Sequence, residues 1–128
     1  MTTKTASSNK NVRMAQIIMY LAATSALLAG VGGIANVTAA SDDTVVVELW
    51  RVIGFFTFAG LFTILARKPQ SNRSLWAIVI LNKLALSIAG LVLMGNSSIQ
   101  GASDLIIFDG GLTLLLVASS LLAGAWKK

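Results

Sequence analysis

Residues 75–95 read LWAIVILNKLALSIAGLVLMG and contain one charged side chain, that of Lys83. A bilayer is crossed by about 20 mostly apolar residues in a helix, so this stretch predicts a transmembrane helix. Strands of a membrane β-barrel would instead alternate over about 10 residues, and this run is longer and continuously apolar. Three more runs of the same kind occupy residues 14–35, 45–66 and 105–126. The sequence therefore predicts an all-α membrane protein with four transmembrane helices.

Short connections join the four predicted spans, at residues 36–44, 67–74 and 96–104. Connections of this length favour antiparallel neighbours, so we expect an up-down four-helix bundle. This single transmembrane domain would cover residues 14–126. A polar cytoplasmic tail at residues 1–13, expected to be disordered, would precede it, and a basic end at residues 127–128 would follow it.

Basic residues gather on one side of the predicted membrane. The first and third connections contain no Lys or Arg. Eight of the ten basic residues lie before span one, near the second connection or at the chain end: Lys4, Lys10, Arg13, Arg67, Lys68, Arg73, Lys127 and Lys128. The positive-inside rule then places both termini in the cytoplasm. All the acidic residues fall in the opposite half: Asp42, Asp43, Glu48, Asp104 and Asp109.

A cleaved signal peptide is the alternative interpretation of residues 1–40. A basic start, an apolar stretch and the small residues at 37–40 resemble such a segment. The apolar stretch, however, is roughly twice as long as the 7–15 residues typical of a signal peptide. Cleavage would leave three spans, with the new N-terminus outside the cell.

The composition excludes several classes of protein. Charged residues make up 12% of the chain and hydrophobic residues 55%, which excludes an ordinary soluble domain and a nucleic-acid-binding module. The chain has no Cys and no His, so thiol chemistry and the commonest metal ligand are missing. No glycine-rich phosphate-binding motif is present. We therefore expect a protein that is not an enzyme and uses no cofactor or metal.

Ionisable residues inside predicted spans are the candidate functional residues, because a charge in the bilayer is costly. They are Lys83, Asp109 and Arg51, together with Glu48, which lies three residues before Arg51 and can pair with it. One interpretation is an outer charge cluster of Glu48, Arg51, Asp104 and Asp109 that locks span two to span four. The other is an outward-facing mouth that binds an ion.

Lys83 lies near the middle of span three. Its distance from Asp109 along the membrane normal is about 13 Å by helix rise, and the two side chains lean in opposite directions. We therefore expect no Lys83–Asp109 pair. Lys83 shares a stripe with Ser87, Gly90 and Met94, and Asp109 shares one with Thr113, Ser120 and Gly124. Such stripes are typical of a bundle interior or of a narrow polar cavity.

Small residues predict where the helices meet, because association in lipid depends on close packing. Span one carries Ala22, Ala26, Gly30 and Gly33 on one stripe, which we interpret as intramolecular packing before homodimerisation. Gly54 and Gly60 would mark the contact face of span two in the same way. Three tryptophans lie near span ends, as expected of an aromatic belt: Trp50, Trp76 and Trp126.

In span number and length, over the whole chain, the sequence resembles small four-helix membrane proteins of bacteria, DoxX-like proteins included. No site residue is carried over from this resemblance. We expect a multi-pass protein of the bacterial cell membrane that acts by helix packing or association, as an accessory or regulatory subunit. Its partners would be the lipid bilayer and a second copy or another membrane protein, not nucleic acid.

Two alternatives remain open at this point. The first is a small oligomeric transporter or channel protomer that uses Lys83 and Asp109. The second is an enzyme acting on lipid or quinone with Arg51 and Asp109, although no nucleophile and base can be named for it.

Overall fold

The computed structural model describes residues 2–127, and every regular element in that range is a helix. Its elements are α1 (Thr2–Ala39), α2 (Val45–Arg67), α3 (Arg73–Leu93), α4 (Ala102–Asp104), η1 (Leu105–Asp109) and α5 (Gly110–Leu122). The last three follow one another directly and form one helical run, in which η1 is a π-helical segment. The described chain thus has four helices long and apolar enough to span a membrane.

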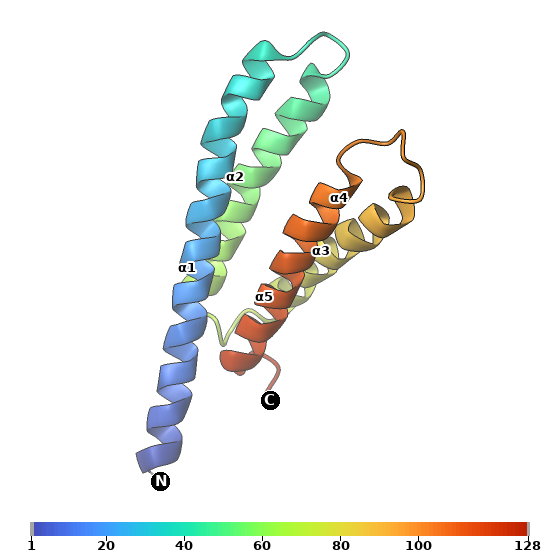
Figure 1. Cartoon of the computed structure of the whole chain (residues 1–128). Helices are drawn as coiled ribbons and strands as arrows, with labels where there is room; N and C mark the ends of the chain where they lie inside the picture. The colour runs from blue at the N-terminus through green and yellow to red at the C-terminus, as the bar shows by residue number, and fades with distance from the viewer. Residues whose placement is uncertain (1, 128) are drawn as a thin grey trace.

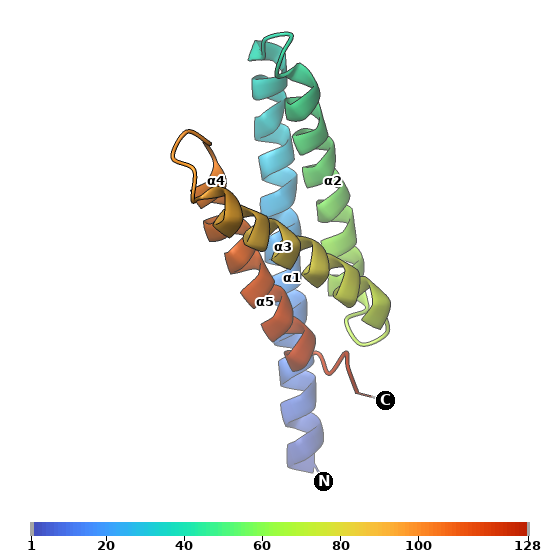
Figure 2. The same ribbon diagram turned by 90° about the vertical axis from the view of Figure 1, so that its right-hand side faces the viewer.

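The helices associate as two pairs (Figure 1). α1 packs along α2, and α3 packs against η1 and α5, while α5 also contacts α1. The α1–α2 turn and the α3–α4 connection lie toward the top of Figure 1, and the α2–α3 turn and both chain ends lie lower. Figure 2 shows α3 crossing the other helices obliquely. The two pairs therefore meet mainly at their lower ends and diverge upward.

The hydrophobic core lies where the two pairs meet. It contains Met19 and Ala23 of α1, the end of α2, the start of α3, and Leu116 of α5. Trp76 is fully buried here, and its indole Nε1 donates a hydrogen bond to the Pro69 carbonyl at 2.8 Å. The aromatic-belt prediction is therefore wrong for Trp76, because its ring fills the core. Trp50, by contrast, is 77% exposed.

Two glycines of α1 allow α2 to approach closely. A Cβ on Gly30 would lie 2.9 Å from the Phe56 ring, and one on Gly33 would lie 2.8 Å from a Val52 methyl group. The prediction that the span-one stripe packs inside the molecule is confirmed at these two positions. It is wrong for Gly54 and Gly60 of α2, since a Cβ on either would meet no heavy atom of the described chain within 4 Å.

The helix boundaries differ from the sequence prediction at both ends of the chain. α1 is one 38-residue helix that begins at Thr2, so the disorder expected for the first dozen residues is wrong. A helix already nucleated by its apolar part extends at little cost into polar residues. The fourth helical run covers residues 102–122 instead of 105–126.

A glycine cap explains why α5 ends at Leu122. Gly124 has a positive φ of 67°, its N–H bonds to the Leu121 carbonyl, and the Ala125 N–H bonds to the Ser120 carbonyl. These two bonds define a Schellman motif. Gly124, placed in a packing stripe from the sequence, thus acts as a helix terminator.

Arg73 joins the start of α3 to the segment that follows α5. Its guanidinium donates to the carbonyls of Ala125, Trp126 and Lys127 at 3.4, 2.9 and 3.2 Å. In the sequence, Arg73 contributes only to the excess of basic residues that predicts the cytoplasmic side. The structure also gives it a second role, since these bonds tie the start of α3 to the segment that follows α5.

Candidate functional site

An ion pair lies between α3 and η1. Lys83 Nζ is 3.1 Å from Asp109 Oδ1, and the two side chains are only 11% and 13% exposed. Lys83 Nζ also lies over the Phe58 ring of α2, 4.0 Å from its centroid, within the range of a cation–π contact. Lys83 therefore holds together residues from three of the four long helices.

The prediction that Lys83 and Asp109 do not pair is wrong. It placed the helix ends at Gly95 and Leu105, whereas α3 ends at Leu93 and the fourth run begins at Ala102. These five residues of boundary error correspond to about 7 Å of helix rise. About 6 Å of the expected 13 Å remains, and the oblique course of α3 in Figure 2 together with the long Lys side chain accounts for it.

The π-helical segment sets the position of Asp109. A π turn adds a residue to the helical repeat and changes which side chains face inward downstream. Asp109 is the last residue of η1, and it is buried although Phe108, before it, is 67% exposed. In the sequence, Asp109 followed by Gly110 and Gly111 predicts a helix start, because an acidic residue suits the first turn of a helix. The helical run instead begins seven residues earlier, directly after Gly101. The φ of Gly101 is 87°, a left-handed conformation that changes the direction of the backbone just before the helix.

Small residues let α3 approach this segment closely. A Cβ on Gly90 would lie 2.9 Å from the Ala102 carbonyl oxygen and 3.0 Å from both Ile106 and Leu105. A Cβ on Gly110 would lie 3.7 Å from Ser87 Oγ. The two backbones can therefore come near enough for the ion pair to close.

Hydroxyl groups beside the ion pair are occupied by their own helices. Ser87 Oγ donates to the Lys83 carbonyl at 2.8 Å, and Thr113 Oγ1 donates to the Asp109 carbonyl at 2.7 Å. Ser87, Gly90 and Thr113 are buried, as expected for interior stripes, but Met94 is 56% exposed. The polar stripes thus form a filled helix contact.

The outer charge cluster predicted from the sequence does not assemble. Glu48 and Arg51 form the expected pair within α2, with 3.3 Å between Nη1 and Oε2, but the Arg51 side chain is 54% exposed. Asp104 is exposed, and Asp109 pairs with Lys83. Neither of these two ion pairs links α2 to the fourth helical run, because α2 and α5 do not pack against each other in the described chain.

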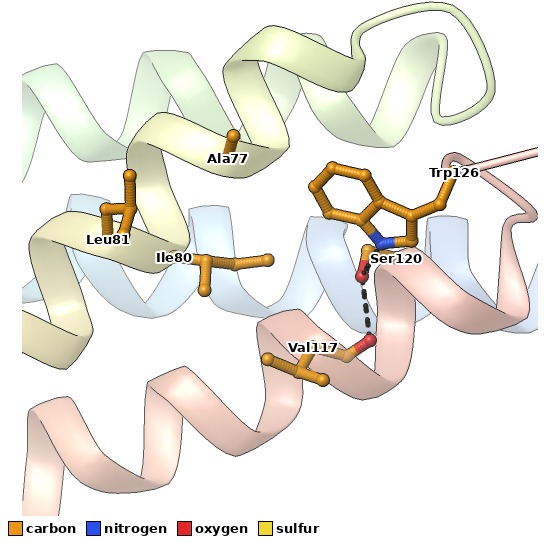
Figure 3. A pocket seen from close by; sticks show the side chains of 6 residues that line it. All are labelled: Ala77, Ile80, Leu81, Val117, Ser120 and Trp126. Carbon is orange, nitrogen blue, oxygen red and sulfur yellow. Dashed lines mark hydrogen bonds between the residues drawn. The ribbon is translucent and has the colours of Figure 1, made fainter.

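The described residues contain no group of three or more His, Cys, Asp and Glu side chains that could hold a metal ion. A shallow hollow of about 390 Å³ lies between α3 and the end of α5 (Figure 3). Its polar atoms are occupied, since Trp126 Nε1 donates to Ser120 Oγ, which donates to the Val117 carbonyl. The hollow is therefore an apolar surface, and its lining includes neither Lys83 nor Asp109.

Asn82 is a polar residue whose importance the sequence did not show. It lies at the centre of α3, next to Lys83, and its side chain is exposed. The sequence alone does not say which way the Asn82 side chain faces, because apolar residues lie on every side of α3. Comparisons with protein-family models, curated proteins and solved structures found no match to this chain.

Proposed function

We propose that this chain is a multi-pass protein of the bacterial cell membrane that acts by helix association, as a non-enzymatic accessory or regulatory subunit. The observation that carries the proposal is the closed Lys83–Asp109 pair. Two opposite charges in direct contact offset each other's cost of burial, and this pair connects α3 to η1. The two buried ionisable residues of the spans, Lys83 and Asp109, are thus paired with each other inside the protein.

The surroundings of the ion pair support this proposal. The free side of Lys83 Nζ faces the Phe58 ring, and the neighbouring hydroxyls bond to backbone carbonyls. The hollow of Figure 3 is lined by residues other than Lys83 and Asp109. A substrate would have to displace contacts already made within the protein.

The charge distribution supports an orientation with both termini in the cytoplasm. The α1–α2 turn and the α3–α4 connection carry no basic residue, whereas the α2–α3 turn contains Lys68 and is flanked by Arg67 and Arg73. Lys and Arg near span ends favour the cytoplasmic side. In this orientation the first twelve residues of α1 extend the helix toward the cytoplasm.

A flux assay tests the proposal. Purified protein in lipid vesicles is compared with the double variant Lys83→Met/Asp109→Leu, which removes both charges together, and with protein-free vesicles. We expect proton, Na⁺, K⁺ and Cl⁻ fluxes to be the same in all three preparations. A flux seen only with the wild-type protein contradicts the proposal.

The alternative is a transporter or channel protomer, and one observation favours it. Asp109 is an ionisable residue in a span and lies in a π-helical segment, and both features are frequent at functional sites. The same assay separates the two functions, since transport through this pair would be abolished in the double variant.

A further inference from the structure

The exposed amide of Asn82 is unusual for its depth. Asn82 is nine residues from the start of the 21-residue α3, or about 14 Å along the helix, which is close to its midpoint. Its side chain makes no hydrogen bond to any residue that the structure describes. Other exposed polar residues of the spans, such as Thr57, donate to a carbonyl of their own helix. Asn82 therefore presents donors and an acceptor outward.

An unpaired amide at the middle of a bilayer has no water to bond with. Lipid tails offer neither donors nor acceptors, so each unsatisfied polar group there costs free energy. Asn side chains in membrane helices commonly meet this requirement by bonding to another helix. No residue that the structure describes bonds to this amide, and its exposed position on α3 leaves it open to a bonding group on a separate molecule.

The residues around Asn82 form a contact face on α3. Ile78 and Ala85 lie four residues before it and three residues after it, on the same side of the helix, and both are exposed. Apart from the amide the face is apolar, and the small Ala85 side chain permits a close approach. We refer to Ile78, Asn82 and Ala85 as the Asn82 face.

We infer that the Asn82 face binds the Asn82 face of a second copy of this chain, so that the two amides bond to each other in the middle of the membrane. This inference rests on the proposed function and names its partner. Two features select a second copy. An amide is both donor and acceptor and so is complementary to itself. Two copies inserted with the same orientation place Asn82 at the same depth, related by a twofold axis along the membrane normal.

Disulfide cross-linking tests this contact directly, because the chain has no Cys. Ala85→Cys lies on the Asn82 face. Leu84→Cys is the matched control. Leu84 is also exposed and is the residue before Ala85, but it lies on the far side of the helix from Asn82. After oxidation in membranes we expect a covalent dimer for Ala85→Cys and little for Leu84→Cys. Equal yields, or a cross-link to a different protein, would overturn the inference.

A second measurement isolates the amide. Energy transfer between labelled copies, followed as the vesicles are diluted with lipid, gives the dimer dissociation constant. We expect Asn82→Leu to raise that constant roughly 3- to 20-fold, the range for one interhelical hydrogen bond in a membrane. Asn82→Leu must retain the helical circular dichroism and detergent stability of the wild-type protein.

A wild-type chain that is monomeric at every dilution, or an unchanged constant in Asn82→Leu, overturns the inference. Either result leaves the proposed function standing if the vesicles show no flux that depends on Lys83 and Asp109. A flux that is lost in the Lys83→Met/Asp109→Leu variant would instead overturn the proposed function. The two failures are therefore distinguishable.

Discussion

Lys83 and Asp109 stabilise the bundle only as a pair. Each side chain is nearly nine-tenths buried, and each supplies the opposite charge that the other needs. Phe58 adds an aromatic face to Lys83 Nζ, which links α2 to the α3–η1 contact. Removing one member leaves the other as a buried charge without a partner, which costs free energy.

Single and double variants of this pair should therefore differ sharply. We expect Lys83→Met to lower the free energy of unfolding by about 3–5 kcal/mol, the usual effect of breaking a buried ion pair. Lys83→Met/Asp109→Leu should unfold within about 1 kcal/mol of the wild-type protein, since no unpaired charge remains. The measurement is loss of helical circular dichroism as a mild detergent is replaced by a denaturing one. Equal stability of the single and double variants would show that the two buried charges are not energetically coupled.

At the scale of elements, the contact between α3 and the fourth helical run depends on Gly90. This glycine faces the Ala102 carbonyl and the first residues of η1, so the π-helical segment lies directly against α3. Its missing side chain and the π turn together bring Asp109 within reach of Lys83. The ion pair is thus a product of helix geometry as much as of residue type.

Substituting Gly90 should disturb this contact. A Cβ there would be 2.9 Å from a backbone oxygen, which cannot move without shifting α4, so we expect Gly90→Ala to destabilise the protein. Overpacking of this kind typically costs about 1–3 kcal/mol. Gly60→Ala is the matched control, because a Cβ on Gly60 meets open space and should leave stability unchanged or slightly higher. Detergent unfolding of both variants checks this, and equal losses would show that Gly90 has no special packing role.

At the scale of the whole molecule, two helix pairs are joined through a core at one end. The core contains Phe62, Trp76 and Leu116, and the Arg73 bonds to the C-terminal segment lie at the same end. Toward the α1–α2 turn the pairs diverge, as Figure 1 shows. The lower end therefore holds the four helices together, and the proposed orientation places it on the cytoplasmic side.

Thiol labelling tests that orientation, again because the chain has no Cys. Ser41→Cys and Ser97→Cys lie in the α1–α2 and α3–α4 connections, and Ser71→Cys lies in the α2–α3 turn. A membrane-impermeant reagent should label the first two in intact cells and the third only after the cells are opened. The reverse pattern would contradict the orientation.

The intact mass of the purified protein shows whether residues 1–40 are removed as a signal peptide.

The sequence determined the number of spans, their approximate positions and the Glu48–Arg51 pair, because hydropathy and i, i+3 spacing are local properties. It also identified Lys83 and Asp109 as intramembrane ionisable residues and Gly30 and Gly33 as packing positions. Only the tertiary structure decided which of these residues meet. The Lys83–Asp109 contact depends on helix ends, on a π turn and on the oblique path of α3, and each of these results from packing between segments distant in the chain. The outward direction of Asn82 was decided in the same way, since the apolar residues on every side of α3 leave its rotation to the neighbouring helices.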